Sequence, residues 1–92
     1  MFVDDDRSIL DGIRRTIKKQ PWRERFSSSF FVDGVSALDA MKGNPPHILV
    51  TDMEMPGMRG SELLQRTHDQ YPSIQTFILS GKCSKTEVDG LL

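Results

Sequence analysis

Two hydrophobic patterns alternate along this chain: continuous apolar runs, and apolar positions that recur every three or four residues. The continuous runs predict four buried β-strands, because a strand covered on both faces of a sheet is apolar along its whole length. The recurring positions predict amphipathic helices between the strands. The predicted strands cover residues 1–3, 28–32, 47–51 and 74–79, and the predicted helices cover residues 7–19, 34–43, 60–70 and a stretch that begins at residue 84.

Capping residues mark the ends of these helices. Asp6 is positioned to cap the first helix and Pro21 ends it. Asp33-Gly34 opens the second helix and Gly43 stops it, whereas Ser84-Lys85-Thr86-Glu87 fits a capping box. The side chains expected to face the core are Ile9, Leu10, Ile13 and Ile17 in the first helix, Val35, Leu38 and Met41 in the second, and Leu63, Leu64 and Thr67 in the third.

The order of the elements predicts the fold class. Strands and helices alternate from residue 1 onward. This alternation is typical of an α/β domain, in which right-handed crossovers make a parallel sheet with helices on both faces.

Composition narrows the picture to one small domain. The 92 residues carry a formal net charge of −1 and are 37% hydrophobic, which suits a single domain over residues 1–92. The near-neutral charge gives no electrostatic reason to expect nucleic-acid binding by this domain. No apolar stretch approaches the length of a membrane span, so we expect no membrane insertion. Cys83 is the only cysteine, which favours the reducing cytoplasm.

Acidic residues follow two of the predicted strands. Asp4 and Asp5 come after the first strand, and Asp52 comes after the third. Because the carboxyl ends of parallel strands meet at one edge of a sheet, we expect the three carboxylates to lie close together. Their mutual repulsion would raise each pKa unless a cation intervened. A hard divalent ion with oxygen ligands, above all Mg2+, suits such a site.

Two simpler interpretations stay open at this point. Asp6 is expected to be a helix cap and not a metal ligand, but a shift of one residue would make Asp5-Asp6 the working pair. Asp52 precedes proline and glycine, so it has a second interpretation as an ordinary turn residue.

The loop after Asp52 contains three methionines, Met53, Met55 and Met58. We expect them to pack against the core, since thioethers are poor ligands for hard ions.

Three segments of the chain resemble the receiver domain of bacterial two-component response regulators. They are residues 2–5 (Phe-Val-Asp-Asp), residues 48–60 (Ile-Leu-Val-Thr-Asp-Met-Glu-Met-Pro-Gly-Met-Arg-Gly) and residues 77–81 (Phe-Ile-Leu-Ser-Gly). Their order and spacing are compatible with the family, and the resemblance covers essentially all of the chain. It implies a flavodoxin-like, doubly wound parallel sheet with strand order 2-1-3-4.

The resemblance also implies a role for each site residue. Asp52 would accept a phosphoryl group from a sensor histidine kinase, and the modified domain would switch an output domain or a downstream protein. Asp5 and Asp52 would ligate Mg2+ directly, Asp4 would act mainly through water, and the main-chain carbonyl of Glu54 would complete the ligands. Ser80 would supply the hydroxyl that binds the phosphate. The domain would assist only its own phosphorylation and dephosphorylation.

Some parts of the family pattern have no counterpart in these residues. The resemblance implies a fifth strand, a lysine after it and a fifth helix, so we expect either a fragment or a shortened receiver. Lys82 stands two residues after Ser80, and Glu54 stands two residues after Asp52. We hypothesise that Glu54 and Lys82 face each other across the rim of the site and modulate the lifetime of the phosphoryl group.

Two other functions compete with the receiver. The first is a non-phosphorylated scaffold: a bare edge at the fourth strand, residues 76–79, predicts a homodimer or a domain swap. The second is a phosphohydrolase of the haloacid-dehalogenase type, with Asp52 as nucleophile and Glu54 as acid/base. The proline and glycine after Glu54 and the acidic pair after the first strand count against this enzyme.

Overall fold

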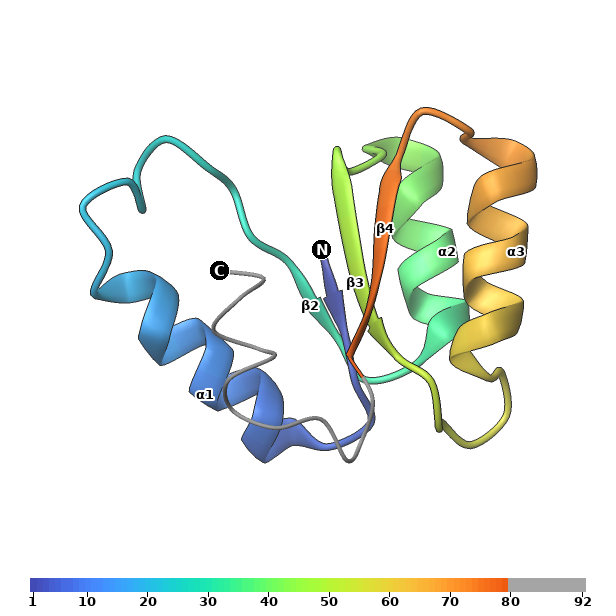
Figure 1. The fold of residues 1–92 in the computed structure, drawn as a ribbon, viewed down its shortest axis with the longest axis horizontal. Helices are drawn as coiled ribbons and strands as arrows, with labels where there is room; N and C mark the ends of the chain where they lie inside the picture. Colours follow the sequence, from blue (N-terminus) through green and yellow to red (C-terminus); the bar gives the residue numbers. More distant parts are fainter. Residues whose placement is uncertain (80–92) are drawn as a thin grey trace.

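The computed structural model describes residues 1–79, and four strands alternate with three helices over these residues (Figure 1). The helix predicted from residue 84 lies outside the described residues. No helix within residues 1–79 has both the length and the apolar character that crossing a membrane requires. The elements are β1 (Phe2–Val3), α1 (Arg7–Lys18), β2 (Phe30–Phe31), α2 (Gly34–Gly43), β3 (Ile48–Asp52), α3 (Gly60–Gln70) and β4 (Gln75–Leu79).

The four strands form one parallel sheet in the order β2-β1-β3-β4, which confirms the predicted order. Phe2 of β1 lies opposite both Phe30 of β2 and Val50 of β3, so the short β1 strand is held on both sides. Helices α2 and α3 cover one face of the sheet, and α1 lies on the other (Figure 1). The second strand is shorter than predicted, two residues instead of five.

Aspartates cap two of the helices, as predicted. The Asp6 carboxylate accepts a hydrogen bond from the Ser8 amide at 2.9 Å, and the Asp33 carboxylate accepts one from the Ser36 amide at 2.7 Å. These bonds satisfy amides that have no partner within the first turn of a helix. Asp6 therefore belongs to the start of α1, and Asp4-Asp5 is the acidic pair that remains free for the site.

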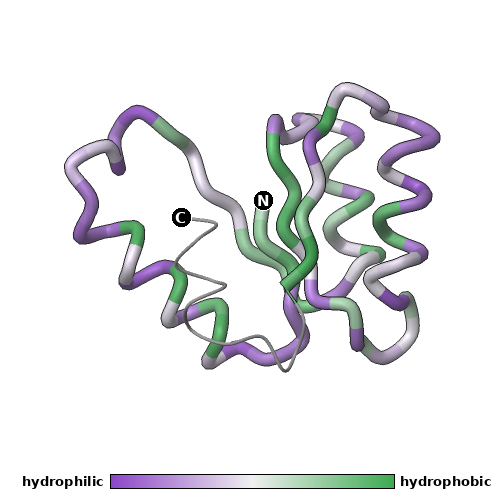
Figure 2. Tube along the Cα trace, viewed as in Figure 1, coloured by the Kyte–Doolittle hydropathy of each residue, from purple (hydrophilic) through white to green (hydrophobic). Residues whose placement is uncertain are grey.

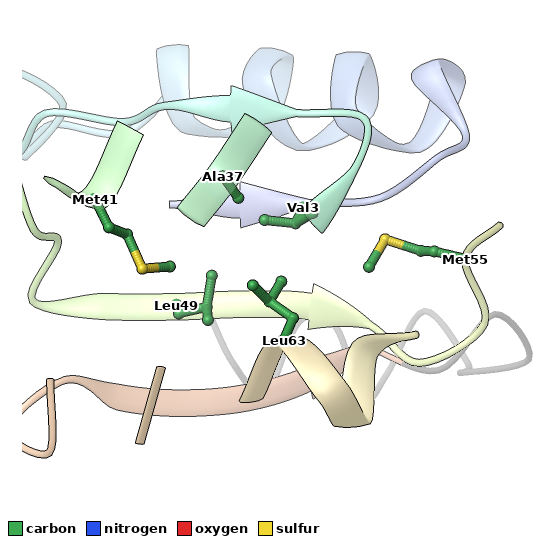
Figure 3. Packing of buried hydrophobic residues seen from close by; sticks show 6 residues of the cluster. All are labelled: Val3, Ala37, Met41, Leu49, Met55 and Leu63. Atoms are coloured by element: carbon green, nitrogen blue, oxygen red, sulfur yellow. The ribbon is translucent and has the colours of Figure 1, made fainter. Parts of the chain in front are cut away.

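The hydrophobic core has two layers, one on each face of the sheet. The larger layer fills the space between the sheet and helices α2 and α3 (Figure 3); its buried residues are Val3, Ala37, Met41, Leu49, Met55 and Leu63. The smaller layer lies beneath α1 and contains Ile13, Ile17, Val50 and Leu79. Apolar residues therefore concentrate on the strands, and the helices alternate between polar and apolar positions (Figure 2).

Helix α2 corrects one prediction about the core. Val35 was expected to face inward, but its side chain is 65% exposed. The buried positions of this helix are Gly34, Ala37 and Met41. Two of these residues are small, so α2 packs close to its neighbours through glycine and alanine, and Val35 lies on the solvent side.

The fourth strand is the most exposed part of the sheet. Four of its five residues are exposed, and only Leu79 is buried. Phe77 is 39% exposed and Ile78 is 45% exposed, on successive and therefore opposite faces. Within residues 1–79, β4 pairs with β3 alone.

Candidate functional site

Three carboxylates meet at the carboxyl edge of the sheet. Asp4 and Asp5 follow β1, and Asp52 is the last residue of β3. These strands are neighbours, with Val3 opposite Thr51, so the residues after them lie side by side. One oxygen from each carboxylate lies within 4.8 Å of the other two. The sequence-predicted trio is therefore brought together.

Two of the three carboxylates are buried, and each has one oxygen without a hydrogen-bond partner among the described residues. Asp4 is 2% exposed and Asp52 is 4% exposed, whereas Asp5 lies at the surface. Oδ1 of Asp4 accepts a hydrogen bond from the Asp6 amide at 2.9 Å. Oδ2 of Asp4 and Oδ1 of Asp52 are buried and have no hydrogen-bond partner among the described residues. Buried oxygens without a partner are costly, and a hard cation with oxygen ligands would satisfy both.

The same burial changes the acidity of the site. The pKa of Asp4 is raised to about 6, mainly because the carboxyl group is buried. The hydrogen bond from the Asp6 amide lowers this pKa, whereas the charges of Asp52 and Asp5 raise it. Burial also raises the pKa of Asp52, although the backbone amides of Glu54 and Met53 partly offset this shift. Both shifts show that the site disfavours accumulated negative charge, as expected for a cation-binding cluster.

The raised pKa of Asp4 predicts an unusual pH dependence of stability in the metal-free protein. Between its ordinary value of 3.8 and about 6, the folded chain binds more protons at Asp4 than the unfolded chain does. The contribution of Asp4 to the free energy of unfolding therefore falls as pH rises through this window, by about 1–3 kcal/mol. We expect Asp4→Asn to be more stable than the wild type at pH 7 and to show a weaker pH dependence, of which the part due to Asp52 remains.

Urea unfolding at pH 5 and pH 7 in the presence of a chelator measures the effect. Asp11→Asn is the matched control, because Asp11 is an exposed acid on α1. An Asp4→Asn chain less stable than the wild type at pH 7 would contradict the interpretation.

Gly60 holds the loop after Asp52 in place, a role that sequence reasoning missed. The Gly60 amide donates to the Met53 carbonyl at 3.0 Å, so the start of α3 is fastened to the residue after the site. A Cβ at Gly60 would lie 2.7 Å from the Cα of Met53, and closer still to the carbonyl oxygen of Asp52. The sequence indicates this close contact only by the presence of a glycine, and a glycine at this position is equally compatible with an ordinary helix start.

The other predicted site residues fall into two groups. Glu54 is exposed in the loop after Asp52, and its charge acts on the Asp52 carboxylate. Its role at the rim of the site stays a prediction. Ser80 and Lys82 lie outside the described residues. Two of the three loop methionines pack as predicted: Met55 is a buried core residue, and Met58 packs against the same cluster.

The chain is similar in sequence to several curated proteins. The uncharacterized transcriptional regulatory protein YesN of Bacillus subtilis is 37% identical over 84 residues, which cover 88% of this chain and 22% of YesN. The response regulator MprA of Mycobacterium avium is 29% identical over 87 residues. The chain spans about a fifth to a third of the length of the curated relatives it matches.

Solved structures agree with the fold. A two component transcriptional regulator AraC from Clostridium phytofermentans is 30% identical with a TM-score of 0.73, covering 94% of this chain and 68% of that one. The signal receiver domain of an HD domain-containing protein from Pseudomonas fluorescens is 25% identical with a TM-score of 0.79, covering 96% of this chain and 67% of that one. The family model of the response regulator receiver domain matches residues 1–91. The chain belongs to the response regulator receiver domain family.

Proposed function

We propose that residues 1–92 form a single receiver domain in which Asp52 accepts a phosphoryl group from a sensor histidine kinase. The observation that carries this proposal is the Asp52 carboxylate, buried at the strand edge with one oxygen unpartnered beside two other acids. A carboxylate in that position is a nucleophile for phosphoryl transfer. Family membership supports this function and not the alternative of a haloacid-dehalogenase-type hydrolase.

The transfer would be a displacement at phosphorus. An Asp52 oxygen forms a bond to phosphorus, and the bond from phosphorus to the donor breaks. The donor atom is a histidine nitrogen of the kinase or the acyl oxygen of acetyl phosphate, and it leaves with the electron pair. The domain assists only this reaction and the later hydrolysis of its own aspartyl phosphate.

Mg2+ fits the donor set of this site. The two unpartnered oxygens, on Asp4 and Asp52, and the nearby Asp5 carboxylate are hard oxygen ligands. We propose that Asp5 and Asp52 bind the ion directly, that Asp4 acts mainly through water, and that the Glu54 main-chain carbonyl completes the protein ligands. When bound, the ion neutralises the charge on the phosphoryl oxygens.

The direct test is intact mass after incubation with acetyl phosphate and Mg2+. We expect a gain of one phosphoryl group that disappears when a chelator replaces the metal. A folded sample with no gain would remove the support for a phosphoacceptor.

Glu54 is proposed to lengthen the lifetime of the aspartyl phosphate through its negative charge. A carboxylate at the rim disfavours an approaching anion or hydroxide-like water, so we expect Glu54→Ala to shorten the dephosphorylation half-life by about 2- to 5-fold. Lys82→Ala should lengthen it, because the ammonium offsets that charge. Loss of radiolabel over time measures the half-lives of the Glu54→Ala and Lys82→Ala variants, with exposed Glu62→Ala as control. Unchanged half-lives in both variants would contradict the proposal.

Ser80 is proposed to bind the phosphate through its hydroxyl.

The partners and location belong to the same proposal. YesN is a transcriptional regulatory protein, and one solved neighbour belongs to an HD domain-containing protein. We therefore propose that the phosphorylated domain acts on an output domain or a downstream protein, in the cytoplasm. The domain itself is not proposed to bind nucleic acid or membrane.

Self-association is a second candidate function, favoured by the exposure of β4. Phe77 and Ile78 present apolar surface on both faces of a strand whose outer edge has no partner strand among residues 1–79. Such an edge is a template for pairing with another chain. We expect a dimer or a domain-swapped assembly of this 92-residue chain.

Light scattering after size exclusion, over a range of concentrations, measures the assembly. Ile78→Lys should shift the chain toward monomer because a charge on the edge strand disfavours pairing. Val35→Lys is the control, since Val35 is also apolar and exposed but lies on α2. A wild-type chain that is folded and monomeric throughout would contradict the prediction.

A further inference from the structure

A groove lies far from the acidic site, at the opposite end of the sheet. It has a volume of about 450 Å³ and is bounded by the second half of α1, the segment that follows it and the start of β2. Ser28 and Phe30, at the entry to β2, line its wall. Because the strands are parallel, the beginnings of the strands lie at one end of the sheet and Asp52 lies at the other.

The floor of this groove is apolar and partly exposed. Ile17, Phe26 and Phe30 contribute the apolar lining. Phe26 is 65% exposed, the joint highest value among the large hydrophobic residues within residues 1–79. The ring of Trp22 contacts Phe26 edge-on, with centroids 5.7 Å apart, so the exposed ring has a fixed neighbour. An exposed, supported aromatic ring is typical of a binding surface.

Three cations surround this floor, and two of them are held in place. The Arg14 guanidinium lies 4.6 Å above the centroid of the Phe30 ring. Arg23 donates a hydrogen bond to the Gln20 carbonyl at 3.1 Å. Lys18 is the third cation, and Glu24 is the one acid that lines the groove among residues 1–79. Cations already positioned by the fold lose less freedom when a ligand binds.

The charge extends beyond the groove. Seven of the twelve Lys and Arg residues of the chain fall between residues 7 and 25, where only two acids accompany them. The remaining residues are therefore strongly acidic, although the whole chain has a net charge of only −1. The small net charge hides a basic face on α1 and the segment after it. Such a face attracts anionic partners.

We propose that this groove is a docking site for an acidic peptide segment of a partner protein, with an aromatic or large aliphatic side chain as its anchor. The anchor would pack on Phe26 and Ile17, and flanking carboxylates would pair with Lys18 and Arg23. The open form of the site and the cations beyond it favour a peptide over a small molecule. The apolar floor and Glu24 favour a peptide over nucleic acid, whose phosphates need neither.

The test uses the full chain and a defined probe, a synthetic peptide in which one phenylalanine is flanked on each side by two glutamates. Trp22 is the only tryptophan of the chain and contacts the groove residue Phe26, so its fluorescence reports binding. We expect a saturable change with a Kd below about 1 mM. A Lys18→Gln, Arg23→Gln double variant should bind at least about 5-fold more weakly.

Matched variants separate a docking site from diffuse attraction. Lys19 and Arg25 neighbour the groove cations in sequence but do not line the groove. The Lys19→Gln, Arg25→Gln double variant removes the same charge and should bind within about 2-fold of the wild type. Phe26→Ser, read by calorimetry, should weaken binding about 10-fold. Binding is measured without a phosphoryl donor, so the result does not depend on the proposed phosphorylation of Asp52.

Three outcomes would overturn the proposal. The first is the absence of saturable binding, and the second is equal weakening of binding in the two double variants. The third is binding as tight as that of the probe by a control ligand, either the same peptide with serine in place of phenylalanine or a short duplex DNA. Circular dichroism of each variant confirms that a loss of binding is not a loss of fold.

Discussion

We expect the Asp52→Asn chain to gain no phosphoryl group from acetyl phosphate under conditions in which the wild type gains one. Asparagine keeps the size and the backbone position of Asp52 at the end of β3, so the sheet and the buried neighbours are preserved. Its amide is not a nucleophile for phosphorus and carries no charge for a metal. The expected effect is therefore loss of the modification and not loss of the fold.

Intact mass spectrometry provides the measurement, with thermal unfolding to show that the variant is folded. Asp39→Asn is the control, because Asp39 is an exposed carboxylate on α2, distant from the acidic cluster. A mass gain retained in Asp52→Asn would assign the phosphoryl group to another residue. No gain in any folded form of the chain would leave self-association as the better-supported function.

Gly60→Ala is expected to destabilise the domain by about 3 kcal/mol or more. The added Cβ would overlap the backbone at Asp52 and Met53, and neither can move aside as a flexible side chain would. The helix α3 would have to shift away from the end of β3, which would also displace the loop that carries Glu54. We expect Tm to fall by at least about 10 °C and phosphorylation to slow.

Gly43→Ala is the matched control for this substitution. A Cβ at Gly43, the last residue of α2, would meet nothing within 4 Å. Alanine favours a helix over glycine by about 0.5–1 kcal/mol, so Gly43→Ala should be neutral or stabilising. Equal effects of the two substitutions on Tm would show that close packing at Gly60 is not the cause.

Much of the fold follows from local signals that the sequence displays. Aspartates before helices predicted the caps at Asp6 and Asp33, and helical spacing predicted the burial of Ile13 and Ile17. Val35 was misplaced because hydrophobic periodicity gives small residues too little weight. Helix α2 lies close to the sheet, so its glycine and alanine occupy the inner face and its valine does not.

Part of the site could also be predicted from the sequence. Strand ends in a parallel sheet share an edge, so the meeting of Asp4, Asp5 and Asp52 follows from their positions after two strands. The close approach of Gly60 to the Asp52 carbonyl is a contact through space between a loop and a helix. No local propensity encodes it. The groove beneath α1 depends likewise on how the segment after α1 returns to the sheet.

The two unpartnered oxygens of Asp4 and Asp52 mean that this domain is locally frustrated. In the core the choice of residues agrees with the fold: aspartates cap α1 and α2, and apolar side chains fill the two layers beside the sheet. At the sheet edge the residues oppose folding, because buried like charges lower the stability of the empty domain. A sequence optimised for stability alone would replace these acids. We therefore propose that the chain gives up stability at this place in order to bind a cation.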